Sequence, residues 1–158
     1  MVKLNIGCGK DIRDGYVNID IRKTHPSVII ADVRSLPYKE NSIDEIRASD
    51  VYEHVGFRES EKLLKHWVSL LKNGGKIYIH TSCFISSAKF MSESNTAEKI
   101  ERAIAILFGG QDYIENTHYT IGHPVLFEKY LRNAGIKGNI VCKTGIGNGT
   151  CMEVIATK

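Results

Sequence analysis

The sequence predicts an α/β protein with a mostly parallel sheet that closes in a C-terminal antiparallel hairpin. Three observations support this class. Short apolar segments of strand length alternate with segments of helical periodicity, an order typical of parallel sheets. A turn with two glycines, Gly7 and Gly9, directly follows the first strand-like segment, and the second such segment carries an acid, Asp20. The last two strand-like segments are joined by a glycine-rich stretch, residues 145–149, which indicates a hairpin.

Five strands are predicted in the first part of the chain, over residues 2–6, 17–21, 28–31, 43–48 and 76–80. Only residues 10–15 separate the glycine turn from the second strand, whereas a crossover with a helix needs at least about ten residues. Six extended residues reach about 20 Å, which is enough to run back along a five-residue strand of about 17 Å. We therefore expect a shortened first crossover without a full helix, and a second strand parallel to the first.

The first predicted helix spans residues 59–72. Its apolar side chains follow the helical period of 3.6 residues, and they are Leu63, Leu64, Trp67, Val68, Leu70 and Leu71. We expect Asn73-Gly74-Gly75 to end this helix, because glycine readily takes the left-handed conformation that closes helices.

The second predicted helix spans residues 95–108. Asn95 with Glu98 resembles a capping box at its start. Its apolar stripe consists of Ile100, Ala103, Ile104 and Leu107. We expect this stripe to mark the side of the helix that packs on the protein.

The third predicted helix spans residues 124–134, with Pro124 in its first turn and Gly135 just past its end. Two closing strands follow, near residues 138–143 and 151–157. We expect these strands to pair as an antiparallel hairpin at the edge of the sheet.

Composition limits the classes of protein that fit. At 158 residues the chain is long enough for one domain with a substantial core, and we take residues 1–158 as a single domain. The net charge is +3 without a run of Lys or Arg, so no nucleic acid partner is indicated. No apolar stretch approaches the roughly 20 residues of a membrane helix. The four cysteines are scattered and lack zinc-site spacing, so no metal site is predicted. The first predicted strand starts at residue 2, so we expect no signal peptide and a cytoplasmic protein.

The glycine turn and Asp20 form a candidate ligand site. Glycine lacks a Cβ, so the backbone of the turn can approach a ligand closely. An acid on the next strand can accept hydrogen bonds from ribose hydroxyls, as in α/β proteins that hold nucleosides. A tight turn beside a surface acid is the alternative. Without a full helix after the turn, the helix-N-terminus site for a pyrophosphate is weak, which favours a nucleoside without phosphate.

Six motifs then occur in order along the chain. They are Asn5-Ile6-Gly7-Cys8-Gly9, Val17-Asn18-Ile19-Asp20, Ala31-Asp32-Val33-Arg34-Ser35-Leu36-Pro37-Tyr38, Ile43-Asp44-Glu45-Ile46, Val51-Tyr52-Glu53-His54 and Leu70-Leu71-Lys72-Asn73-Gly74-Gly75-Lys76. This ordered set resembles the class I S-adenosylmethionine-dependent methyltransferases, of the small "predicted methyltransferase" type, closely over residues 2–82 and more loosely beyond. The resemblance implies a Rossmann-like class I methyltransferase sheet and S-adenosylmethionine as the cofactor.

The resemblance also implies which residues contact that cofactor. They are Asn5, Gly7, Cys8, Gly9, Asp20, Asp32, Val33 and Ser49. Asp20 matches the acid on the ribose hydroxyls, Asp32 matches the acid that accepts from the adenine amino group, and Val33 offers its backbone N–H to the ring. Ser49 lies in the loop beside the methionine moiety. Two features depart from the pattern: Asn5 stands where many relatives have an acid, and the third glycine is absent. A simple turn-capping role is the alternative for Asp32.

Two histidines are the candidate catalytic residues. His54 follows the fourth strand, and it is either a catalytic base or a structural hydrogen-bonding group beneath the cofactor loop. His118 lies in a long polar and aromatic loop, residues 109–123, whose content is typical of functional loops. We expect residues 84–123 to form a lid on the acceptor side, with His118 or Tyr119 reaching toward the acceptor. The alternative for His118 is a loop anchor.

The leading hypothesis is an enzyme that moves a methyl group from S-adenosylmethionine to an acceptor that the sequence does not identify. The alternative is a catalytically silent S-adenosylmethionine-binding module that acts through a partner. A third hypothesis, an NAD-dependent oxidoreductase, is disfavoured by the missing third glycine and the short first crossover. The sequence leaves the oligomeric state open.

Overall fold

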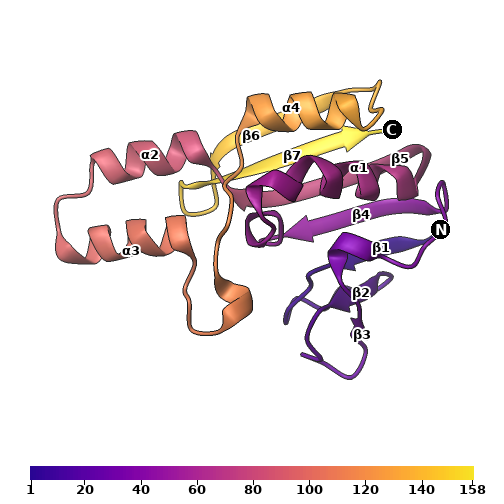
Figure 1. Cartoon of the computed structure of the whole chain (residues 1–158), viewed down its shortest axis with the longest axis horizontal. Coiled ribbons are helices and arrows are strands. Elements are labelled where there is room, and N and C mark those ends of the chain that lie inside the picture. The colour runs from indigo at the N-terminus through magenta and orange to yellow at the C-terminus, as the bar shows by residue number, and fades with distance from the viewer.

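The sheet has the predicted strand directions, mostly parallel with an antiparallel hairpin at its C-terminal end. A computed structural model describes all 158 residues, and its seven strands form one sheet in the order β3-β2-β1-β4-β5-β7-β6 (Figure 1). The strands are β1 (Lys3–Ile6), β2 (Val17–Asp20), β3 (Ile29–Ile30), β4 (Ile43–Ser49), β5 (Leu71–Ser82), β6 (Ile140–Ile146) and β7 (Cys151–Thr157). Strands β1 to β5 run parallel, and β7 is antiparallel to both β5 and β6. The expected closing hairpin is confirmed.

The shortened first crossover is also confirmed, and two asparagines hold it in place. Residues 10–15 contain no helix, yet β2 pairs parallel to β1. The buried Asn5 amide donates to the Asn18 side-chain oxygen at 2.9 Å and to the Asp11 carbonyl at 2.7 Å. The same Asn18 oxygen accepts from the Arg13 backbone N–H at 3.0 Å. These bonds satisfy the buried amides of the two strands and two backbone groups of the connection, which contains no helix to pair them.

The helices divide into two pairs. Helices α1 (Ser60–Leu70) and α4 (Pro124–Asn133) lie side by side over the sheet, whereas α2 (Phe84–Ser92) and α3 (Ala97–Phe108) form a hairpin that extends beyond the strand ends (Figure 1). Four short 3-10 turns complete the elements: η1 (Val33–Ser35), η2 (Tyr52–His54), η3 (Phe57–Glu59) and η4 (Ile114–Asn116). The main core contains 26 buried residues, with Trp67, Tyr52 and Phe127 as its largest fully buried side chains.

The opposite face of the sheet is polar. In β4, Ile46 and Ala48 are buried in the core, while the alternating residues Glu45 and Arg47 are half-buried on the other face. The Arg47 guanidinium donates to Glu45 at 3.0 Å and lies 4.2 Å from the ring centre of Tyr78 on β5. Parallel sheets are usually covered on both faces. Here an ion pair within β4 and a cation–π contact with β5 allow one face to remain partly in water.

Three local predictions about the helices were wrong. Helix α1 ends at Leu70, because the buried Leu71 already pairs with Ile43 in the sheet, and Gly74 (φ +79°) lies within the irregular start of β5. Helix α3 is capped by Thr96, whose hydroxyl accepts from the backbone N–H of Lys99, and not by Asn95. Helix α2 was not predicted.

The predicted apolar stripe of α3 is only partly buried. Ala103 is buried, but Ile100 and Ile104 are about half exposed, at 48% and 52%. The reason is that α3 packs on α2 in the projecting hairpin and not on the sheet. At α4 the predicted ends are correct: Pro124 begins the helix, the His123 ring accepts from the Val125 N–H, and Gly135 follows with φ +100°.

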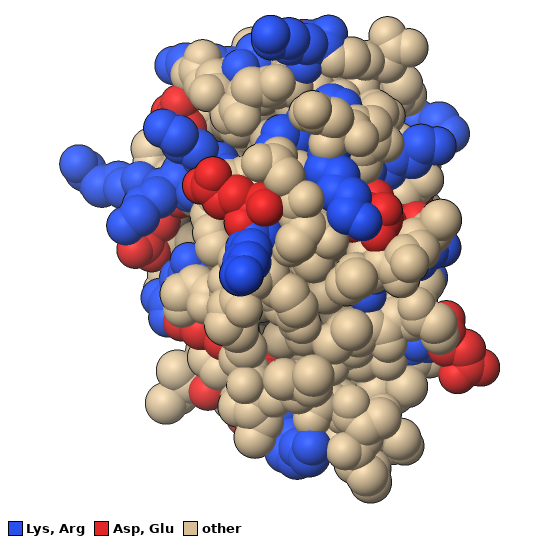
Figure 2. Space-filling view, turned by 90° about the vertical axis from the view of Figure 1, so that its right-hand side faces the viewer, with Lys and Arg blue, Asp and Glu red and all other residues tan.

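The surface carries charges of both signs. Figure 2 shows one face on which Lys and Arg lie among Asp and Glu, with the basic side chains more numerous in its upper half. The overall excess is small, at +3. No helix of the chain is both long enough and apolar enough to cross a bilayer.

Candidate cofactor and acceptor site

A cavity of about 600 Å³ lies at the carboxyl ends of β1, β2 and β4. This volume is within the range of about 300–1,000 Å³ typical of small-molecule sites. The eight residues expected to contact a cofactor all line it: Asn5, Gly7, Cys8, Gly9, Asp20, Asp32, Val33 and Ser49. The position agrees with the rule that α/β sheets bind ligands outside the carboxyl ends of their strands.

The two glycines of the turn differ in what surrounds them. Gly7 has φ +61°, and a Cβ placed on it would lie 2.1 Å from Cγ2 of the buried Val51. Gly9 has φ +52°, and nothing lies within 4 Å of the corresponding position. Gly7 is therefore required for packing against the loop after β4, whereas Gly9 leaves open space where a ligand can approach the backbone.

Asp20 is fixed by the backbone around the turn. It is only 7% exposed, and its two carboxylate oxygens accept from the N–H groups of Gly9 at 2.8 Å and Arg22 at 2.9 Å. A carboxylate has about four acceptor positions, so two remain for a ligand in the cavity. Asp20 thus both orders the turn and offers acceptors to the site.

Cys8 lies between the two glycines and is buried. Burial, with a smaller contribution from the Asp20 charge, raises the pKa of the Cys8 thiol to about 11. The thiol is therefore protonated at neutral pH and is a poor nucleophile. Its role is that of a small side chain in a tight turn.

Asp32 has the turn-capping role, and its contact with adenine stays a prediction. Its carboxylate caps η1 by accepting from the Arg34 N–H at 2.9 Å, and it also lines the cavity. A bidentate pair with the Arg34 guanidinium holds the pKa of Asp32 below its usual value. The next residue, Val33, accepts from the Trp67 indole at 2.8 Å, which fixes this turn on α1.

The loop after β4 is held by an ion pair with β5. Asp50 lines the cavity with φ +53°, and its Oδ1 is 3.0 Å from Nδ1 of His80. This bond is the main reason that the pKa of His80 rises to about 10. His80 does not line the cavity. A protonated imidazole that is already paired positions Asp50 and is not available as a base.

The structure brings the two candidate catalytic histidines into contact but places them in different spaces. His54 lines the cavity, whereas His118 lines a neighbouring groove; their ring centres are 4.9 Å apart. Each ring is bonded through Nδ1 to a backbone carbonyl, His54 to Thr117 at 3.1 Å and His118 to Ile106 at 2.9 Å. A carbonyl can only accept, so Nδ1 carries the proton and Nε2 of a neutral ring has a free lone pair. His118 also anchors its loop by this bond, and its catalytic role stays a prediction.

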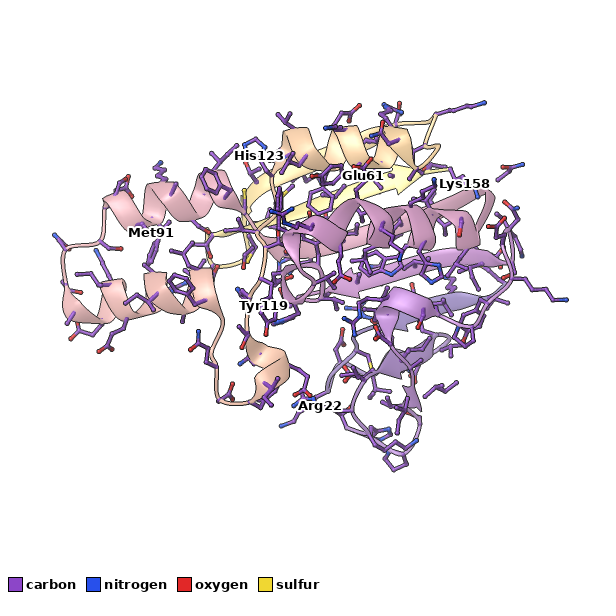
Figure 3. The ribbon with its side chains drawn as sticks, viewed as in Figure 1. Arg22, Glu61, Met91, Tyr119, His123 and Lys158 are labelled. Atoms are coloured by element: carbon purple, nitrogen blue, oxygen red, sulfur yellow. The ribbon has the colours of Figure 1, made fainter.

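Part of the segment 84–123 lines the cavity, and its role as a lid stays a prediction. Tyr113, the η4 turn and Tyr119 line it, while helices α2 and α3 do not. The Arg22 guanidinium, 3.9 Å from the ring centre of Tyr113, connects the end of β2 to this segment (Figure 3). The sequence indicated a functional loop here but gave no sign of its contact with Arg22.

Glu53 is a further residue whose role the sequence did not reveal. It is 1% exposed, and its carboxylate accepts from the Thr81 hydroxyl at 2.8 Å. Its backbone carbonyl accepts from the N–H groups of Tyr119 and Thr120. Glu53 therefore ties the loop after β4 to β5 and to the segment that passes over the site.

Solved structures with the same fold include methyltransferases. The alignment with an S-adenosylmethionine-dependent methyltransferase from Archaeoglobus fulgidus covers 99% of this chain and 85% of that enzyme, with a TM-score of 0.67 and 15% identity. The alignment with an enzyme from Thermotoga maritima, described as a possible histamine N-methyltransferase, covers 99% of this chain and 82% of that one, with a TM-score of 0.64 and 16% identity. A third similar structure is a chain in the complex of the Haloferax volcanii Trm112 methyltransferase activator with a methyltransferase. That alignment covers 99% of this chain and 81% of the other, with a TM-score of 0.65 and 10% identity. A comparison with curated protein sequences gives no match.

The sheet order, the glycine turn and the acids at the ends of neighbouring strands define the Rossmann-like class of nucleoside-binding folds. Residues 8–79 match a family model described as a methyltransferase domain. The family match and the shared fold support a class I S-adenosylmethionine-dependent methyltransferase with S-adenosylmethionine as its cofactor.

Proposed function

We propose that the cavity holds S-adenosylmethionine with its ribose at Asp20, its adenine at Asp32 and Val33, and its methionine part near Gly9 and Ser49. The observation that carries this proposal is the position of the buried Asp20 carboxylate. It lies in one cavity with an open glycine backbone and a second strand-end acid. These are the donor and acceptor types that a nucleoside without phosphate requires.

The charge of the cavity supports the same ligand. Five acidic residues line it, and they are Asp11, Asp20, Asp32, Asp50 and Glu115. Three basic residues line it, and they are Lys10, Arg22 and Arg34. The excess of two negative charges favours a sulfonium cation and disfavours the pyrophosphate of a dinucleotide.

The chain's contribution to transfer is alignment and proton acceptance. When bound, the cofactor supplies a methyl group on positively charged sulfur, and that S–C bond breaks as the acceptor forms its own bond to the carbon. The fixed Asp20, Gly9 and Asp32 orient the cofactor, and such alignment supplies much of the acceleration of a displacement. His54 lines the same cavity with Nε2 free to accept the proton that a hydroxyl or amine acceptor releases.

Calorimetry with S-adenosylhomocysteine tests the ribose assignment. Asp20→Asn removes a charge-assisted acceptor, so we expect the affinity to fall by roughly tenfold or more. Because Asp20 also orders the turn, the 2′-deoxy analogue is measured as well: its disadvantage in the wild type is expected to vanish in Asp20→Asn. Asp44→Asn, a change at the opposite strand end where Asp44 pairs with Lys72, is the matched control. An unchanged affinity in Asp20→Asn, or equal affinity for NAD, contradicts the assignment.

A second candidate function is a cofactor-binding module that needs a partner for transfer. It is favoured by the likeness to the Haloferax volcanii chain found with the Trm112 activator. On this alternative the purified chain binds S-adenosylhomocysteine but transfers no methyl group to any member of a broad acceptor screen. Transfer by the isolated chain excludes it.

A further inference from the structure

A second hollow lies next to the cofactor cavity. This groove has a volume of about 520 Å³ and is formed by η3, the start of α2, the end of α3, the segment after η4 and the first turn of α4. Its apolar wall includes Phe57, Phe84 and Phe108, which are 58%, 51% and 52% exposed. Large aromatic side chains clustered around a concavity in this way indicate a binding surface more than isolated exposed residues do.

The groove adjoins the cofactor cavity. Tyr119 lines both spaces, and its backbone is held to Glu53 on the loop after β4. His54 on the cavity side and His118 on the groove side are in edge-to-face contact, with ring centres 4.9 Å apart. A molecule in the groove therefore lies beside the residues that line the cofactor cavity.

The lining of the groove specifies the chemistry of its occupant. None of its ten lining residues is Asp, Glu, Lys or Arg, whereas eight charged residues line the cofactor cavity. Its polar side chains are the His118 and His123 rings, the Thr120 hydroxyl and the Tyr119 phenol. A charged ligand would lose its hydration here without gaining a partner, while an apolar body would be buried favourably.

We propose that this groove binds the body of the methyl acceptor, and that the acceptor is a neutral molecule with an aromatic or branched aliphatic body and one hydroxyl or aromatic amine. This inference rests on the proposed function. The apolar body packs on the phenylalanines, and the single polar group lies toward the histidine pair. The free Nε2 of His118 then accepts a hydrogen bond from that group and orients it.

Binding of 2-naphthol, followed by its fluorescence, tests the inference without methyl transfer. We expect 2-naphthol to bind together with S-adenosylhomocysteine, and Phe108→Ser to weaken it by about fivefold or more because apolar contact is lost. Ile104→Ser is the matched control, since Ile104 is also 52% exposed on α3 but does not line the groove. The 2-naphthoate anion, of similar shape, is expected to bind at least about tenfold more weakly.

The outcomes separate the two claims. Four outcomes would each overturn the inference about the groove: 2-naphthol does not bind, it binds Phe108→Ser and wild type equally, 2-naphthoate binds as well as 2-naphthol, or 2-naphthol competes with S-adenosylhomocysteine. Failure of S-adenosylhomocysteine to bind while 2-naphthol still binds overturns the proposed function instead.

Discussion

Replacing Gly7 by alanine tests why the first motif needs a glycine at this position. The backbone there has φ +61°, and the new Cβ would lie 2.1 Å from Cγ2 of Val51 and 3.2 Å from two other Val51 atoms. The left-handed conformation costs a non-glycine residue about 1–2 kcal/mol, and overpacking of a tight core costs about 1–3 kcal/mol. We expect Gly7→Ala to lower the free energy of unfolding by about 2–5 kcal/mol.

Gly9 provides the matched control. It also has a positive φ, +52°, but no atom lies within 4 Å of the position that a Cβ would take there. Gly9→Ala should therefore cost only the conformational term, about 1–2 kcal/mol. Urea unfolding of the two variants and the wild type measures the difference directly.

A double variant isolates the contact with Val51. In Gly7→Ala with Val51→Ala the obstructing methyl groups are gone, so the combined loss should be smaller than the sum of the two single losses by at least about 1 kcal/mol. Equal destabilisation by Gly7→Ala and Gly9→Ala, or simple additivity in the double variant, would refute the packing argument. The role of Gly7 would then be only to let a ligand approach the backbone.

Three further predictions concern the loops around the site. Asn5→Ala removes the two bonds that the buried Asn5 amide donates to Asp11 and Asn18, so it should cost about 1–3 kcal/mol and speed amide exchange over residues 10–16; unchanged exchange there would contradict this. Tyr113→Leu removes the Arg22 contact, worth about 0.5–2 kcal/mol, and should speed exchange over residues 111–117 with the midpoint of global unfolding nearly unchanged, whereas a slower or equal exchange would contradict it. His80 has a raised pKa of about 10, so its pair with Asp50 stabilises the fold fully below the ordinary histidine pKa and this contribution is lost as pH rises through about 10. His80→Gln should thus lower stability by at most about 1 kcal/mol at pH 6 and by nothing at pH 11, and an NMR titration that shows a neutral His80 ring at pH 8 would contradict the assignment.

Much of the sheet could be predicted because its signals are local. The alternation in β4, where Ile46 and Ala48 face the core and Glu45 and Arg47 face away, is visible in the sequence. The short first crossover could be predicted because only residues 10–15 connect the glycine turn to the second strand. The bonds of Asn5 that hold it were not predicted, because a buried amide pair between neighbouring strands has no periodic signal.

The errors arose where tertiary packing overrode local pattern. Leu71 continues the apolar period of α1, yet its burial beside Ile43 takes it into the sheet. Ile100 and Ile104 form a helical stripe, but the hairpin that carries them does not pack on the core.

The candidate site divides in the same way. The glycines and acids could be placed because each stands at the end of a strand, where a parallel sheet brings such positions together. The contact of Arg22 with Tyr113, and the aromatic groove beside His118, join segments far apart in the sequence. Only the fold brings these groups together.

A crystal structure of the chain with S-adenosylhomocysteine would show whether the cavity holds the cofactor as proposed. We expect density in the cavity at the ends of β1, β2 and β4, with both ribose hydroxyls within hydrogen-bond distance of Asp20 and the adenine against Asp32 and Val33. The sulfur should face His54, on the side of the cavity that adjoins the groove. Density outside this cavity, or a ribose that makes no contact with Asp20, would contradict the account.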